Sequence, residues 1–113
     1  MIWIVFTGKE LFRKKTRKFA VMMEGRNVCL KIAGTDLGGR LGFFTTRWVE
    51  ADGPEAASNT ALNMVRQELA RRRLENEPSD PPLLTVTEVN ELKSFDEVIP
   101  PGEGFTFFPE ENN

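Results

Sequence analysis

The stretch from Gly42 to Leu74 constrains the fold most, because it reads as one strand that runs directly into one long helix. Residues 43–50 are rich in aromatic and β-branched side chains, which suit a pleated, half-buried surface. We therefore predict a strand there, with Phe44 and Trp48 alternating on the face that packs under the helix.

The residues after this strand carry the signals of a helix start. Asp52 is the expected cap, Pro54 suits the first turn, and Glu55 lies three positions after the cap. Apolar residues then recur every three or four positions, at Ala57, Ala61, Leu62, Met64, Val65 and Leu69. We predict a helix over residues 54–74, with the arginines at 71–73 in its last turn, facing the negative end of the helix dipole.

Other segments read as further strands. Residues 19–23 and 28–32 alternate in polarity around a turn that contains Gly25, which predicts a β-hairpin. After the helix, residues 83–89 form a β-branched run that must return alongside the sheet, and residues 104–108 (GFTFF) predict a short edge strand. The glycine-rich residues 33–42 connect the hairpin to the strand that precedes the helix.

The length of 113 residues predicts a single domain over 1–113. Residues 1–16 form an N-terminal extension that the sequence does not place, and residues 94–113 a loop and edge-strand tail. The predicted fold class is α+β, a two-layer sandwich in which a mainly antiparallel sheet of about five strands carries one long helix on one face.

The sequence excludes the commonest catalytic designs. It has no histidine and one cysteine, Cys29, so it lacks histidine relays, the usual zinc ligand sets and any intramolecular disulfide. The glycines lack the spacing of phosphate-binding loops. Three carboxylates, Glu50, Asp52 and Glu55, could in principle bind a hard metal ion, but helix capping already accounts for Asp52 and Glu55. We expect no metal and no cofactor.

An enzyme stays open as a third hypothesis, since carboxylates alone sustain some chemistry on small molecules. It would gain support from a pocket on which Asp36, Arg47 and Glu50 converge. We lean away from an enzyme, because no arrangement of residues in the sequence compels a reaction.

Charge is unevenly distributed along the chain. Residues 1–40 carry nine Lys and Arg against three Asp and Glu, or +6, and residues 41–113 carry six against fourteen, or −8. A basic window flanked by Phe12 and Phe19 is the candidate polyanion-binding site: Arg13, Lys14, Lys15, Arg17 and Lys18. A solvated connection, or attraction to this protein's own acidic part, explains the window about as well, so nucleic acid is not the favoured partner.

One helix can shield only one face of the predicted sheet, so the other face needs solvent-tolerant residues or a second subunit. We predict a homodimer through a sheet face or edge, with the rings of Phe105, Phe107 and Phe108 as the candidate contact surface. The apolar residues 2–6 are too few to span a membrane, and a single cysteine suits a reducing compartment. We expect a cytoplasmic protein without a membrane partner.

Three segments carry a resemblance to a known family: GFFTTRWVEADGPEAA (residues 42–57), DPPLLTVTEVNELKSFD (80–96) and GEGFTFFPEE (102–111). Over residues 17–111 the chain resembles a family of small uncharacterised bacterial proteins with a GF(Y/F)TTR(F/W)VEA strand, a following helix and a GxGFTFxPEE-like end. The resemblance implies a shared fold and a bacterial, cytoplasmic origin. It carries no activity and no site residue. The favoured function is a non-enzymatic interaction or assembly module with an accessory or regulatory role, because the sequence invests its residues mainly in packing surfaces.

Overall fold

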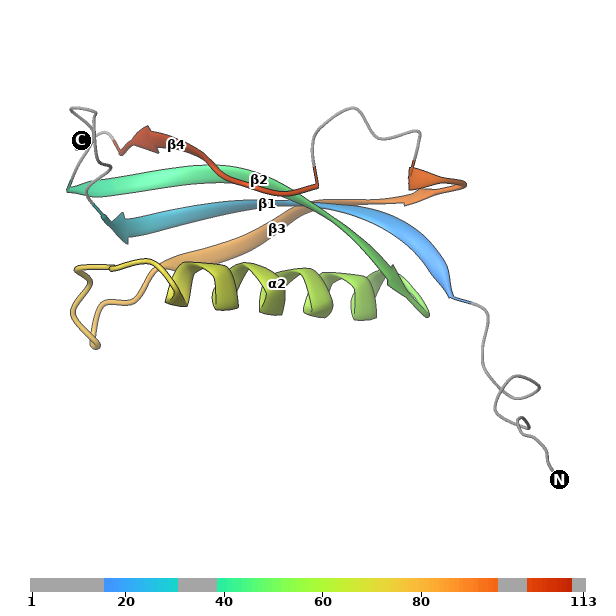
Figure 1. Cartoon of the computed structure of the whole chain (residues 1–113), viewed down its shortest axis with the longest axis horizontal. Helices are drawn as coiled ribbons and strands as arrows, with labels where there is room; N and C mark the ends of the chain where they lie inside the picture. The colour runs from blue at the N-terminus through green and yellow to red at the C-terminus, as the bar shows by residue number, and fades with distance from the viewer. Residues whose placement is uncertain (1–15, 31–38, 96–101, 111–113) are drawn as a thin grey trace, which may run out of the picture.

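The computed structural model describes residues 16–30, 39–95 and 102–110. These residues form the strands β1 (Arg17–Cys29), β2 (Arg40–Ala51), β3 (Leu83–Leu92) and β4 (Thr106–Pro109), and the helix α2 (Pro54–Ala70). Neighbouring strands are antiparallel in the order β3-β1-β2-β4, and α2 lies across one face of the sheet (Figure 1). The predicted α+β class, with an antiparallel sheet and one helix, is confirmed; four strands form the sheet where about five were expected.

The core lies between α2 and the sheet. The helix contributes a stripe of small and medium residues four positions apart, Ala57, Ala61, Val65 and Leu69. The sheet contributes alternate residues of its two central strands, including Phe19, Val21, Met23, Leu41, Phe43 and Val49. Together these residues form one continuous hydrophobic cluster between the helix and the sheet.

The predicted hairpin over residues 19–23 and 28–32 is wrong, because residues 19–23 and 28–29 belong to one continuous strand, β1; residues 31 and 32 lie outside the described residues. The register between β1 and β2 shifts between Gly25 and Val28, and Asn27 takes a left-handed conformation with φ 59°. Glycine and asparagine favour a β-bulge as much as a turn. The residues from Gly25 to Asn27 therefore mark a break in the regular pairing, but the break is a bulge within one strand and not a turn between two.

Hydrogen bonds hold the bulge at Asn27. Its side-chain amide donates to the Asp80 carboxylate at 2.8 Å, and its backbone N–H donates to Glu110 Oε1 at 2.9 Å. Asn76 donates its amide to the Asn27 carbonyl at 2.7 Å and accepts the Cys29 N–H at 2.9 Å. These bonds tie the segment after α2 and the end of β4 to one point of β1.

The predicted placement of Phe44 and Trp48 under the helix is also wrong. The buried face of β2 is the alternate one, with Phe43, Arg47 and Val49. Alternation along a strand assigns its side chains to two opposite faces, but it does not indicate which of the two faces the helix covers. The charged side chain of Arg47 argued against burial of the face with Phe43 and Val49, but Glu68 neutralises that charge inside the protein.

Both predicted ends of the helix need correction. The N-cap is Gly53, and no side chain caps the helix, so Asp52 does not have the predicted role. The backbone carbonyl of Asp52 instead accepts a hydrogen bond from Arg17 Nη1 at 3.2 Å. The helix ends at Ala70, four residues before the predicted Leu74, so the arginines at 71–73 follow the last turn instead of lying in it.

The last two strands lie where the sequence predicted them. β3 pairs with the outer side of β1, and β4 forms a short edge strand on β2 of its own sheet. The chain must therefore pass from one edge of the sheet to the other between β3 and β4. On either side of that connection, Phe95 and Gly102 both lie against Trp48.

Candidate interaction surface

The face of the sheet opposite α2 is the candidate functional surface, and we call it the open face. Its two central strands contribute the side chains that alternate with the core, Ala20, Met22 and Glu24 from β1 and Phe44, Thr46, Trp48 and Glu50 from β2. Phe44, toward one end of this face, has an exposed fraction of 55%. Contiguous exposed apolar groups indicate a contact surface, and the ring of Phe108 lies next to that of Phe44.

The protein itself covers the Trp48 end of the open face. Phe95 stacks on Trp48 with ring centroids 5.8 Å apart and planes 13° apart. A Cβ on Gly102 would come within 2.6 Å of the Trp48 ring, so this glycine permits close packing. Ala20, paired with Trp48 across the strands, is buried as a result.

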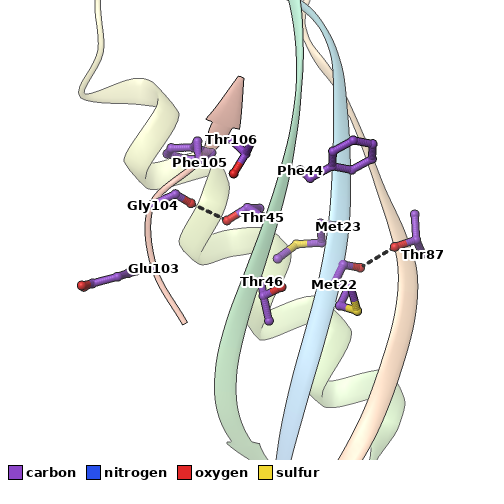
Figure 2. Close-up of a pocket in the computed structure, with 10 residues that line it drawn as sticks. All are labelled: Met22, Met23, Phe44, Thr45, Thr46, Thr87, Glu103, Gly104, Phe105 and Thr106. Atoms are coloured by element: carbon purple, nitrogen blue, oxygen red, sulfur yellow. Dashed lines mark hydrogen bonds between the residues drawn. The ribbon is translucent and has the colours of Figure 1, made fainter. Parts of the chain in front are cut away.

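The Phe44 end of the open face remains uncovered in the described part of the chain. Its ring lies 5.0 Å from the ring of Phe108 on β4. Beside it is a depression of about 400 Å³ lined by Met22, Met23, Phe44, Thr45, Thr46, Thr87, Glu103, Gly104, Phe105 and Thr106 (Figure 2). Apolar groups and threonines make up this lining, with one carboxylate, so the depression suits an apolar group that carries a cation nearby.

Two carboxylates without a cation flank the depression. Glu88 on β3 pairs with Met22, which pairs with Thr46, so these three residues form one row across the strands. Glu103 lines the opposite side of the depression. Among the described residues neither carboxylate has an ion-pair partner, whereas two others on the open face do: Glu24 with Arg26 at 2.8 Å and Glu50 with Lys18 at 3.7 Å.

A buried arginine fixes the wall of the depression from behind. The side chain of Arg47 is 1% exposed, and it donates to both carboxylate oxygens of Glu68 on α2, at 2.7 and 3.1 Å. It also donates to the Gly104 carbonyl at 3.1 Å, to the Thr46 carbonyl at 2.8 Å and to the Thr45 hydroxyl. The Thr45 hydroxyl donates in turn to the Gly104 carbonyl (Figure 2). This network joins the helix, β2 and the segment before β4.

The three phenylalanines predicted to form a partner surface lie on different sides of the sheet. The rings of Phe105 and Phe107 meet Phe43 edge to face, at 4.9 and 5.9 Å, and extend the core. Phe105 also lies under the guanidinium of Arg72 at 5.0 Å. Phe108 alone of the three meets Phe44 on the open face. Their role in binding a partner stays a prediction.

The basic window is divided in a similar way. Arg13, Lys14 and Lys15 lie outside the described residues. Arg17 pairs with Glu91 at 2.7 Å, and its hydrogen bond lowers the pKa of the Glu91 carboxyl. Lys18 pairs with Glu50 and lies 5.9 Å above the ring of Phe95. Two of the five cations therefore have partners in this chain, and polyanion binding stays a prediction for the segment.

The residues named for a carboxylate enzyme do not share a pocket. Arg47 is buried on the helix side of β2, whereas Glu50 is exposed on the open face, and Asp36 lies outside the described residues. The described ranges hold no group of three or more histidine, cysteine, aspartate or glutamate side chains placed to bind a metal ion.

Comparisons with family models, with curated proteins and with solved structures find no match to this chain. None of the helices in the described ranges is long and apolar enough to cross a membrane. The resemblance to the small bacterial family thus stays a prediction, and any functional conclusion must come from the geometry of the open face.

Proposed function

We propose that this protein is a non-enzymatic interaction module that assembles as a homodimer through its open face. The observation that carries the proposal is the contrast at Phe44, which is 55% exposed beside an apolar depression, while Phe43, the residue before it on β2, is fully buried. Burying such a ring gives about 25 cal/mol for each Å² of apolar surface removed from water. A second copy that covers this ring would therefore stabilise the assembly.

Symmetry supports a second copy as the partner. Most soluble assemblies of identical chains are two-fold dimers in which the same patch of both subunits meets. The Phe44 end of the open face offers such a patch, with Met22, Thr46 and Phe108 around it, and the Trp48 end is already closed by Phe95. We propose an accessory or regulatory role in the bacterial cytoplasm, a setting that the single cysteine also suits.

Light scattering coupled to size exclusion tests the proposal at micromolar concentration. The expected mass is twice that of the 12.8 kDa chain, and Phe44→Thr, which keeps a strand-forming residue, should return the protein to the monomer mass. Leu83→Thr is the matched control, because Leu83 is 62% exposed yet lies outside the depression, and it should remain dimeric. A monomeric native chain, or a Phe44→Thr variant that stays dimeric, would contradict the proposal.

A further inference from the structure

We infer that the outer edge of β3 pairs with the same edge of a second copy, so that two four-stranded sheets join into one. The two strands run antiparallel, in the register that places Leu83 of one copy opposite Leu92 of the other. This edge contact uses a different surface from the open-face dimer and does not depend on it. It is argued from the composition of the edge, from the core side chains that reach it, and from the position of a β-bulge.

The two edges of the sheet differ in how they are protected. β3 forms one edge, and its outer side has no strand partner in the described part of the chain. This strand is ten residues long and contains neither proline nor lysine, which commonly protect exposed edges. At the opposite edge, β4 has four residues and ends at Pro109. β3 therefore keeps the backbone donors and acceptors with which a further strand can pair.

The hydrophobic core reaches the β3 edge without being closed there. Leu84, Val86 and Val89 pack against the core cluster on the helix side of the strand, yet all three remain partly exposed. Leu83, at the start of the strand, is 62% exposed. A further strand beside β3 would cover these side chains, so pairing would remove apolar surface from water in addition to forming backbone hydrogen bonds.

A β-bulge lies at the middle of β3. Met22 of β1 pairs with Glu88. The next residue, Met23, pairs with Val86, so Thr87 is the extra residue of the bulge. One extra residue reverses the alternation of faces, so the even-numbered residues before the bulge and the odd-numbered residues after it point to the helix side. The pattern of the two faces is then the same when β3 is followed from either end.

This symmetric pattern lets β3 pair with a second copy of itself over its whole length. Opposite residues of two antiparallel strands point to the same face of the sheet. In the inferred register every pair meets this condition: Leu83–Leu92, Leu84–Glu91, Thr85–Asn90, Val86–Val89 and Thr87–Glu88. A straight strand cannot follow a bulged edge, whereas two copies that bulge at the same place can. The second copy is therefore the partner that this edge fits.

One contact in this register is unfavourable. The two Glu88 side chains would lie beside each other across the two-fold axis, and like charges so close repel. Each Glu88 accepts a hydrogen bond from Asn90 of its own strand, which offsets part of the cost. The edge contact also involves a single strand of each copy. We therefore expect it to be weak and to form at higher protein concentration than the open-face dimer.

Sedimentation equilibrium of the full-length Phe44→Thr variant tests the inference, because this substitution removes the exposed ring of the open face and leaves β3 unchanged. We expect a monomer–dimer equilibrium with a Kd on the order of 0.1–1 mM. Thr85→Lys with Asn90→Lys, added to this variant, places like charges opposite each other twice and should weaken pairing at least about tenfold. Thr85→Lys with Asn90→Glu places opposite charges there and should restore it.

The charge variants report contact between copies, because positions 85 and 90 are about 15 Å apart along one strand. The control for net charge is Asn59→Lys with Asn63→Lys, which adds the same two charges at exposed positions of α2 and should change the affinity less than about twofold. Melting temperatures close to that of Phe44→Thr would confirm that the variants fold. Equal affinities for the like-charge and opposite-charge variants would overturn the inference.

Cysteine cross-linking tests the register. Thr85→Cys with Asn90→Cys, in the Phe44→Thr chain that also carries Cys29→Ser, should form a disulfide-linked dimer under mild oxidation. The two cysteines of one strand are too far apart to join each other. Thr85→Cys without Asn90→Cys should cross-link much less, because residue 85 does not meet its own counterpart in this register. Equal cross-linking by the two variants would overturn the inferred pairing.

The edge contact and the open-face dimer fail in different ways. A Phe44→Thr chain that stays monomeric at about 1 mM would overturn the edge contact and leave the open-face dimer standing. A native chain that is monomeric at micromolar concentration would overturn the open-face dimer, and the measurements on Phe44→Thr would still decide whether β3 pairs with a second copy.

Discussion

The two faces of this sheet are built from the same strands, yet they differ in what covers them. Phe43 and Phe44 are consecutive residues of the same type on β2, and their exposed fractions are 0% and 55%. Phe43 belongs to the core cluster between α2 and the sheet. Phe44 lies on the open face beside a depression (Figure 2). The difference teaches that a strand can place apolar side chains on both faces of a sheet, whereas a single helix can shield only one of those two faces from water.

The largest expected effect tests this difference directly. Phe43→Ala should lower the free energy of unfolding by about 3–5 kcal/mol, since it removes a fully buried ring that contacts Phe105 and Phe107. Phe44→Ala should lower it by less than about 1 kcal/mol in the monomer, since its ring is largely in water and contacts Phe108. Urea unfolding at concentrations below dimer formation gives both values. Equal losses would show that the two faces are covered alike.

A smaller loss is expected for the ion pair that supports the covered face. Glu68→Gln should cost about 2 kcal/mol, because it leaves the 1% exposed guanidinium of Arg47 without a counter-charge. Removing one partner of a fully buried ion pair costs about 3–5 kcal/mol. The cost expected for Glu68→Gln is smaller than this, because the Glu68 side chain is 33% exposed. Glu55→Gln, on the same helix and exposed, is the control and should stay within about 0.5 kcal/mol. Equal results for the two variants would contradict a role for Glu68 in holding Arg47.

The closed and uncovered ends of the open face can be compared through Gly102. Gly102→Ala would place a Cβ 2.6 Å from Trp48, so the cover over this ring must shift, at a cost of about 1 kcal/mol. We expect a red-shifted tryptophan emission relative to the native chain as Trp48 gains water. Gly53→Ala is the control, because its Cβ would meet nothing nearer than the Arg17 guanidinium at 3.9 Å. An unchanged emission spectrum for Gly102→Ala would show that Trp48 does not depend on this cover.

Sequence periodicity predicted the elements better than their relations. The strand before the helix, the stripe from Ala57 to Leu69 and the edge strand at the C-terminus follow from local patterns, and the structure has all three. The face that α2 covers could not be predicted, because the strand over residues 43–50 carries apolar and polar side chains on both sides. Burial of Arg47 depends on Glu68, 21 residues away, and no local pattern contains that pairing.

The open-face depression escaped prediction for a related reason. Its members come from all four strands and from the segment before β4, and only the strand order β3-β1-β2-β4 brings them together. Met22 alternated with the core positions of β1 and could have been assigned to the second face. Glu103 is one acidic residue among many in the second half of the chain, and its place in the lining of the depression became visible only with the fold.

The smallest expected effect compares the buried ion pair with an exposed one on the same sheet. Arg17 and Glu91 join β1 to β3 at 2.7 Å, with side chains 45% and 48% exposed, so solvent screens most of their attraction. The hydrogen bond from Arg17 nevertheless lowers the pKa of Glu91 from its ordinary value of 4.5. A carboxyl whose pKa is lower in the folded protein stabilises the fold above its unfolded pKa, and this contribution is lost as the pH falls through the folded value. The native chain should therefore melt slightly above Glu91→Gln at pH 7, and the gap should close below about pH 4 and in 1 M salt. Glu88→Gln is the control, because it removes a carboxylate that has no cation partner among the described residues, and it should melt at the same temperature as the native chain. If the difference in melting temperature between the native chain and Glu91→Gln persisted unchanged to pH 2, the ion pair would not contribute to it.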